Sequence, residues 1–215
     1  MLLTVIRHGQ SFTNLKTWHT LKNLDAGLTE TGQQQAQALH DWFIANETVA
    51  DVLITSTLKR TLETTAILQP ALKLEPIPDH RIREIPTVSP SGQPLDGENF
   101  GREYASDWAN KAPFVPRCSD IEGAESWMHF RTRVGQFMDD MVAAYHGQRV
   151  YVVAHGGVIS AIFDNIFNVG PYRRADVHNY NTSWSRFEYR NKHDREQWLL
   201  WEHNRTDHLR DAGLL

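Results

Sequence analysis

The sequence predicts an α/β protein, a three-layer α/β/α sandwich around a mainly parallel central sheet. Apolar runs at residues 2–6, 51–56 and 150–154 have the length and continuity of strands that are buried on both faces. Each run is followed, directly or after a loop, by a segment with helical spacing of its apolar residues. Strands that alternate with helices form parallel sheets with right-handed crossovers. We therefore expect the residues that follow these strands to meet at one edge of the sheet.

A surface loop and a helix should follow the first strand. Residues 12–28 lack a regular pattern and are expected to form the loop, pinned by Trp18 and Leu21. Thr29 is a favourable N-cap, and the helix that it opens should end near Asn46. The apolar face of this helix is expected to comprise Ala36, Leu39, Phe43 and Ile44.

The next strand, at residues 51–56, leads directly into a second helix. Leu58, Leu62 and Ala66 have helical spacing, and the helix should stop before Pro70 because proline removes a backbone donor. Residues 72–78 are expected to form a third strand.

The middle of the chain changes character. Residues 86–124 are rich in proline and glycine, with a single expected helix near 96–110. A core pattern resumes afterwards, so we predict one domain over residues 1–215, with 86–124 as an inserted lid or loop.

The last third returns to alternating elements. A long helix over 125–145 carries Phe130, Val134, Phe137 and Met141 on one face, and a helix over 158–167 follows the strand at 150–154. The tail contains two strands, at 183–190 and 197–202. These either complete the sheet or pair with a second subunit, which would give a homodimer.

Composition narrows the class of protein. With 40% hydrophobic and 22% charged residues the chain should fold into a globular domain. The net charge of −4 argues against broad nucleic-acid binding. The single cysteine, Cys118, excludes an intramolecular disulfide and fits a reducing compartment. The chain contains neither a signal peptide nor the roughly 20 apolar residues of a membrane span, so we expect a cytoplasmic protein without a membrane partner.

Charged and polar residues follow three of the expected strands. Arg7 and His8 end the first, Arg60 lies just past the second, and His155 with Gly156 follows the strand at 150–154. Two guanidinium groups offer planar paired donors that suit phosphate, and amides at a helix start add further donors. The sequence therefore predicts an anion site at the carboxyl edge of the sheet.

The same residues resemble the signature of the histidine phosphatase superfamily, in its phosphoglycerate mutase-like branch. The resemblance begins with Arg7-His8-Gly9-Gln10-Ser11 and Asn14. It continues through Leu28-Thr29, Ser56 with Arg60, Arg83-Glu84-Ile85, Glu125-Ser126 and His155-Gly156, in the family order. It implies a phosphoglycerate mutase-like fold. The segment after Glu84 departs from the family pattern, so substrate selection is expected to depend on residues 86–124 and the tail.

The resemblance also implies a role for each residue. His8 would be the nucleophile and become a phosphohistidine; its neutral form is favoured by burial and by neighbouring guanidiniums. Arg7, Arg60 and His155 would stabilise the transferring phosphoryl group, and Asn14 and the Gly156 amide would bind the phosphate. Glu84 would act as general acid and base, although an ion pair with Arg81 or Arg83 would also explain this glutamate. No metal or other cofactor is implied.

Three functions remain open on this basis. The first is hydrolysis of a phosphomonoester, with a phosphorylated small molecule as substrate. The second is a cofactor-dependent phosphoglycerate mutase-type transfer, which would use the same residues but keep water from the phosphoryl group. The third is a phospho-ligand-binding regulatory protein without turnover, which the complete set of core residues disfavours. We favour the phosphatase, because the segment after Glu84 does not match that of the mutases.

Overall fold

The computed structural model describes residues 1–85, 109–116, 124–192 and 195–215, and it contains one six-stranded sheet. The strands are β1 (Leu2–Arg7), β2 (Val52–Ser56), β3 (Pro76–Asp79), β4 (Arg149–Ala154), β5 (Trp184–Lys192) and β6 (Arg195–Arg205), in the spatial order β3-β2-β4-β1-β5-β6. The first four are parallel to one another, and β5 and β6 are antiparallel additions. The predicted mainly parallel sheet is therefore confirmed.

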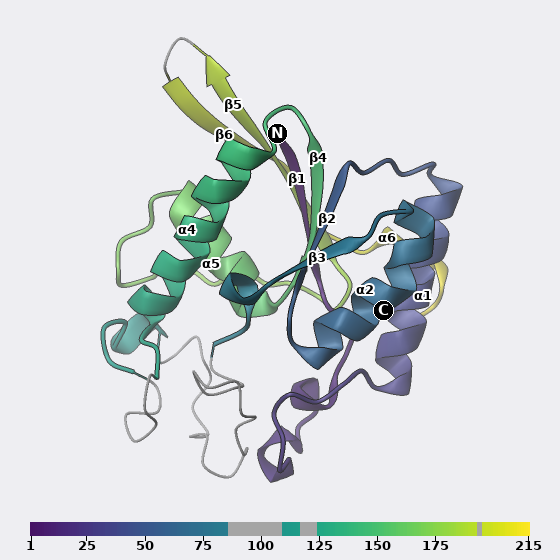
Figure 1. Cartoon of the computed structure of the whole chain (residues 1–215). Helices are drawn as coiled ribbons and strands as arrows, with labels where there is room; N and C mark the ends of the chain where they lie inside the picture. Colours follow the sequence, from purple (N-terminus) through teal and green to yellow (C-terminus); the bar gives the residue numbers. More distant parts are fainter. Residues whose placement is uncertain (86–108, 117–123, 193–194) are drawn as a thin grey trace.

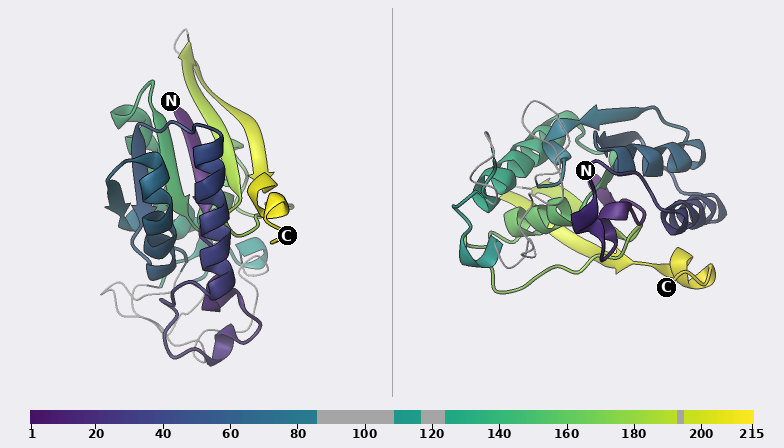
Figure 2. Two further views of the ribbon diagram at one scale, coloured as in Figure 1. Left: turned by 90° about the vertical axis from the view of Figure 1, so that its right-hand side faces the viewer. Right: turned by 90° about the horizontal axis from the view of Figure 1, so that it is seen from below.

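Helices cover both faces of the sheet (Figure 1). On one side α1 (Glu30–Ala45) and α2 (Lys59–Leu72) lie side by side, as Figure 2 shows, with the short α6 (Asp207–Asp211) against α1. On the other side lie α4 (Trp127–Ala144) and α5 (Gly156–Ile166). This arrangement is the predicted three-layer sandwich.

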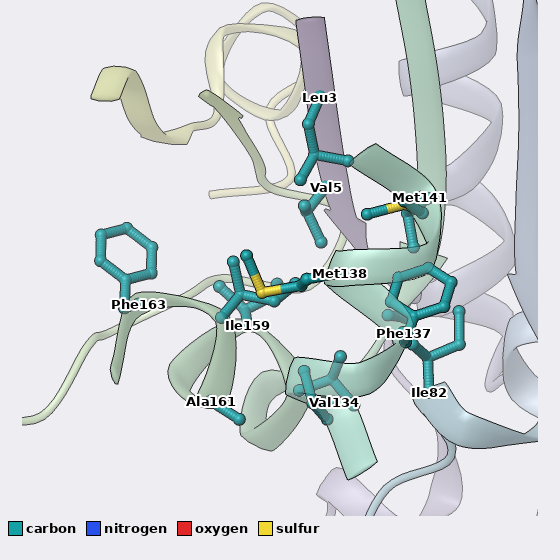
Figure 3. Close-up of a cluster of buried hydrophobic side chains, with 14 of the residues drawn as sticks. Leu3, Val5, Ile82, Val134, Phe137, Met138, Met141, Ile159, Ala161 and Phe163 are labelled. Atoms are coloured by element: carbon teal, nitrogen blue, oxygen red, sulfur yellow. The ribbon is translucent and has the colours of Figure 1, made fainter. Parts of the chain in front are cut away.

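The alternation of side chains along β1 explains why two helical layers are needed. Leu3 and Val5 point into the cluster formed with α4 and α5, part of which is drawn in Figure 3, whereas Ile6 packs in the cluster formed with α1 and α2. Successive strand residues face opposite sides, so a strand that is apolar at nearly every position must be covered on both faces.

The topology brings the carboxyl ends of β1, β2 and β4 together, at the lower end of the sheet in Figure 1. The expected loop at 12–28 lies at this end and contains two short 3-10 turns, η1 (Phe12–Asn14) and η2 (Trp18–Thr20). As expected, Trp18 and Leu21 pack against the buried Leu24 and hold the loop in place.

The tail strands complete the sheet within this chain. β5 pairs with β1 and β6 pairs with β5, so that β6 becomes an edge strand. Both strands are longer than predicted, and the C-terminal α6 was not predicted. Among the residues that the structure describes, no helix is both long and apolar enough to cross a membrane.

Two expectations about the second helix were wrong. The second helix does not stop before Pro70 but continues to Leu72. Pro70 and Ala66, whose carbonyl loses its helical partner, are both exposed, so water can satisfy that carbonyl. The buried face of α2 is formed by Arg60, Thr61, Thr64, Thr65, Leu68 and Leu72 instead of Leu62 and Ala66.

The remaining corrections concern single residues and boundaries. Ile44 of α1 is 58% exposed and does not belong to the core face. The helix expected from 158 begins at Gly156. A further 3-10 turn, η3 (His80–Ile82), follows β3. The lid expected at 86–124 and the helix near 96–110 lie almost entirely outside the described residues.

Phe137 and Ile44 allow a matched test of the core assignment. Phe137→Ala should lower the free energy of unfolding by about 3–5 kcal/mol, because its ring is 1% exposed and leaves a cavity. Ile44→Ala should change it by less than about 0.5 kcal/mol, because a surface side chain loses little on truncation. Urea unfolding of both variants measures the difference, and equal losses would contradict this division between core and surface.

Candidate active site

The structure brings the predicted residues together at the carboxyl edge of the sheet. Arg7 is the last residue of β1 and His8 follows it, while His155 directly follows β4. Arg60 is the second residue of α2, shortly after β2 ends. His8, Arg60 and His155 are 3%, 2% and 0% exposed. Polar side chains from three separate segments are thus buried in one place.

The turn after β1 is positioned by close backbone contact with the start of α1. A Cβ atom at Gly9 would lie 2.4 Å from the carbonyl oxygen of Gly32, and one at Gly32 would lie 1.9 Å from that of Gln10. The Thr29 amide donates to the Gln10 carbonyl at 2.9 Å. Glycine at both positions is therefore required for this approach, which holds the residues after His8 against the first helix.

The two imidazoles are linked through Arg60. Its Nε donates to Nε2 of His8 and to Nδ1 of His155, each at a nitrogen–nitrogen distance of 3.2 Å. The centroids of the two imidazole rings are 5.1 Å apart. Since a guanidinium can only donate, both ring nitrogens must carry lone pairs. Arg60 also donates from Nη1 to the carbonyl of Leu24 at 3.4 Å, which ties it to the loop at 12–28.

The other ring nitrogens determine the tautomers. Nδ1 of His8 lies 2.6 Å from the Gly9 carbonyl oxygen, which can only accept, so the proton of His8 is on Nδ1. Nε2 of His155 lies 2.9 Å from the Ser56 hydroxyl and donates to it. His8 therefore directs an unprotonated Nε2 at the centre of the site.

Burial and charge keep both histidines neutral. Burial lowers the pKa of His8 well below 6.5, and the charges of Arg60 and Arg7 lower it further. Burial followed by the charge of Arg60 has the same effect on the pKa of His155. Burial also lowers the pKa of Arg60 to about 10, so this guanidinium remains charged at neutral pH. The site thus combines neutral imidazoles with permanent cations.

Arg7 adds a second, partly buried cation. Its Nη1 donates to the carbonyl of Asn179, and its Nε is buried without a hydrogen-bond partner in the described part of the chain. Burial lowers the pKa of Arg7, and the charge of Glu84 opposes that effect. Neither Arg7 nor Arg60 forms an ion pair among the described residues, so the site has donors and positive charge available for an anion.

Glu84 reaches the start of α5. One carboxylate oxygen accepts from the Gly157 amide at 2.9 Å and the other from the Ile85 amide at 3.0 Å. The ion pair that sequence analysis left open is not formed in the described residues, because Arg81 pairs with Asp79 and Asp140 and Arg83 donates to Thr57. The carboxyl group of Glu84 therefore lies at the site and is held by two backbone amides.

Asn14 and Gly156 lie at the same edge. The Oδ1 atom of Asn14 accepts from the Ser11 amide at 3.0 Å and from Asn181 at 3.2 Å, so its amide nitrogen is the end that a ligand would contact. Gly156 is the first residue of α5, where backbone amides have no helical partner. A Cβ atom there would lie 3.6 Å from Nε of Arg7.

Sequence analysis assigned no part in the site to several residues that contribute to it. The Ser56 hydroxyl accepts from His155, and the Thr64 hydroxyl accepts from the Gly9 amide at 3.1 Å while donating to the Arg60 carbonyl at 2.8 Å. Both hydroxyls are buried, one at the end of β2 and the other inside α2. A buried hydroxyl next to a charged residue is the signal that would have identified them.

The arrangement suits nucleophilic chemistry on an anionic group. An unprotonated Nε2 can attack, and the adjacent guanidiniums can hold the oxygens of a phosphoryl group. Within the described residues there is no group of three or more histidine, cysteine or acidic side chains placed to hold a metal ion.

Comparison with known proteins identifies the family. The profile of the histidine phosphatase superfamily (branch 1) matches residues 3–203. The chain belongs to this superfamily.

Proteins with different names resemble the chain. The chain is 29% identical to the putative phosphoserine phosphatase 2 of Hydrogenobacter thermophilus over 181 residues, which cover 82% of this chain and 83% of the relative. It is 30% identical to a 2,3-bisphosphoglycerate-dependent phosphoglycerate mutase of Parvibaculum lavamentivorans over 168 residues, covering 75% and 77%. YhfR of Bacillus stearothermophilus has the same fold, with a TM-score of 0.73, 23% identity, and coverage of 97% and 98%.

The buried histidines of this superfamily member predict how its stability depends on pH. In the unfolded chain His155 titrates near 6.5, but folding lowers its pKa well below that value. Below pH 6.5 the unfolded chain thus binds protons that the folded chain does not, and the free energy of unfolding decreases. His155→Asn removes this contribution, so the variant should lose less stability than the wild type between about pH 7 and pH 5. Urea unfolding at both pH values measures this, and identical losses would contradict it.

Proposed function

We propose that the protein is a metal-independent phosphatase that hydrolyses a phosphorylated small molecule through a phosphohistidine on His8. The observation that carries this proposal is the buried, unprotonated Nε2 of His8 beside the buried guanidinium of Arg60 and the partly buried one of Arg7, neither of which has an ion-pair partner among the described residues. A phosphoryl group supplies both the electrophile for the imidazole and the negative charge for the arginines.

The first step transfers the phosphoryl group to the enzyme. Nε2 of His8 attacks phosphorus, the bond from phosphorus to the ester oxygen breaks, and Glu84 in its acid form gives a proton to the leaving alkoxide. Arg7 and Arg60 hold the phosphoryl oxygens as charge builds on them. The Gly9 carbonyl, which accepts from Nδ1 at 2.6 Å, stabilises the positive charge that the phosphorylated imidazole acquires.

His155, Asn14 and the start of α5 complete the phosphate site in this proposal. His155 orients Arg60 through the contact at its Nδ1. Proton uptake at that atom when a phosphate dianion binds would turn it into a further donor to a phosphoryl oxygen. The amides of Asn14 and Gly156 bind the remaining oxygens.

The second step returns His8 to its starting form. Glu84, now a carboxylate, takes a proton from water as that water attacks phosphorus, and the bond from phosphorus to Nε2 breaks. Inorganic phosphate leaves, and Glu84 is again protonated for the next cycle. All atoms in the cycle come from the ester, water and these side chains.

A phosphoglycerate mutase-type transfer is the second candidate, favoured by the 30% identity with a protein named as such a mutase. It would use the same first step and return the phosphoryl group to a hydroxyl in place of water. The two reactions differ in their products, so one assay separates them.

His8→Ala should abolish turnover, because it removes the imidazole that takes the phosphoryl group. The assay measures phosphate release from a panel of phosphomonoesters without metal, beside isomerisation of 3-phosphoglycerate with 2,3-bisphosphoglycerate. His146→Ala is the control. His146 is exposed and lies between α4 and β4, so this variant should behave as the wild type. Metal-independent release that persists in His8→Ala would overturn the proposal, and isomerisation with little release would establish the mutase.

Glu84→Gln should discriminate between leaving groups. An alkoxide needs a proton as it departs, whereas the leaving group of an activated aryl phosphate does not. The value of kcat/KM, which reports the first transfer, should therefore fall about 100-fold or more for alkyl phosphates and less than about tenfold for aryl phosphates. Steady-state kinetics on one ester of each kind measure the ratio. An equal loss for both would mean that Glu84 is not the acid.

Two neighbouring glycines provide a matched control for the position of Glu84. A Cβ atom at Gly157 would lie 2.2 Å from a carboxylate oxygen of Glu84, whereas one at Gly156 meets its nearest neighbour at 3.6 Å. Gly157→Ala should therefore reproduce the leaving-group dependence of Glu84→Gln, and Gly156→Ala should not.

A further inference from the structure

The two peptide planes on either side of His8 are hydrogen bonded at both edges. The plane before it contains the Arg7 carbonyl and the His8 amide, and the plane after it contains the His8 carbonyl and the Gly9 amide. The His8 amide donates to Ala154 at 3.0 Å, and the Gly9 amide donates to the Thr64 hydroxyl at 3.1 Å. The two carbonyls are held by a different segment, the turn before β5.

That turn reaches both carbonyls with one amide. The Thr182 N–H lies 3.0 Å from the Arg7 oxygen and 3.2 Å from the His8 oxygen, and Nδ2 of Asn181 donates to the His8 oxygen at 3.0 Å. Fixing both planes fixes φ and ψ of the residue between them, because these are the two soft backbone dihedrals. The turn therefore helps to set the direction in which the His8 imidazole points.

Thr182 makes these contacts in an unfavourable backbone conformation. Its φ is +56°, in the left-handed region that a β-branched residue rarely occupies. Such a conformation persists where the surroundings hold it in place. Thr182 is 0% exposed, and its side chain makes two hydrogen bonds.

One of those bonds leads to the C-terminal helix. The Thr182 hydroxyl gives its only proton to the Asn181 carbonyl at 2.8 Å, so it accepts from Nε2 of His208 at 3.0 Å. His208 lies in α6 and is 2% exposed, and its Nδ1 is buried without a partner in the described residues. Burial lowers the pKa of His208 to about 4, so the ring is a neutral donor at neutral pH.

We propose that His208 is a positioning residue for the nucleophile. Through Thr182 it stabilises the left-handed turn that holds the carbonyls of Arg7 and His8, and so keeps Nε2 of His8 aligned for attack. His208 touches none of the reacting atoms. The inference rests on the proposed phosphotransfer at His8.

The helix that carries His208 contains its own control. Leu209 is 0% exposed, and its apolar side chain forms no hydrogen bond with the turn. Leu209→Ala therefore weakens the packing of α6 without removing the imidazole donor of His208.

The test compares kcat and KM for an aryl phosphate in the wild type, His208→Ala, Thr182→Val, the double variant and Leu209→Ala. We expect His208→Ala to lower kcat about tenfold with KM within twofold, because a slightly misdirected nucleophile slows the chemical step. His208→Gln, whose amide can place a donor near the position of Nε2, should recover most of that loss. Leu209→Ala should keep kcat within twofold of the wild type while lowering the urea midpoint.

The double variant tests the route of the effect. If His208 acts through Thr182, the double variant should lose no more than the larger single loss, because coupled residues are not additive. Three results would overturn the proposal: wild-type kcat in His208→Ala, an equal loss in Leu209→Ala, or single losses that multiply in the double variant.

A measurement that does not use turnover separates this proposal from the proposed function. The imidazole ¹⁵N resonances of His8, assigned by their absence in His8→Ala, should show one tautomer with the proton on Nδ1 in the wild type and a mixture in His208→Ala. If the wild type releases no phosphate but this change occurs, the phosphatase proposal fails and the positioning role stands. If the wild type turns over and His208→Ala alters neither kcat nor the resonances, only the positioning role fails.

Discussion

The site depends on keeping Arg60 charged in the interior. Burying an unpaired cation is costly unless hydrogen bonds and nearby charges compensate for lost hydration. Here two imidazole lone pairs and the Leu24 carbonyl accept from the guanidinium, and the charges of Glu84 and Asp25 act on it. Burial, together with the charge of this cation, lowers the pKa of both histidines and keeps them neutral. The charge of Arg60 thus contributes to the neutral form of the nucleophile His8, to the orientation of both imidazoles and to the affinity of the site for anions.

The fold makes this burial possible because a parallel sheet collects residues that are far apart in the chain. His8 and His155 follow adjacent parallel strands, and Arg60 enters from the helix after the neighbouring strand. Backbone contacts also hold the site in place. The start of α1 contacts the turn after β1 at Gly9 and Gly32, and α5 donates an amide to Glu84. Rigid elements on every side limit how far the reacting groups can drift.

Support for the nucleophile extends well beyond the residues that would contact phosphate. The antiparallel addition to the sheet ends in α6, and the turn that enters β5 holds the carbonyls on either side of His8. The strained Thr182 lies in this turn, and backbone strain concentrates where the surroundings must hold a group in a single position. The C-terminal part of the chain therefore belongs to the site as much as the N-terminal strand does.

The sequence alone determined the class of fold, the order of the main elements and the residues at the ends of the strands. Continuous apolar runs and helical spacing reflect burial, which is a property of each segment, so they can be read locally. Burial on α2 was misjudged because its inner face carries the polar residues Arg60, Thr61 and Thr64. Arg60 and Thr64 have partners elsewhere in the chain. Only the tertiary structure decided the tautomers of His8 and His155, the amides that hold Glu84, and the link from His208 to Thr182. Each of these depends on contacts between residues distant in sequence, and no local pattern records which donor will meet which acceptor.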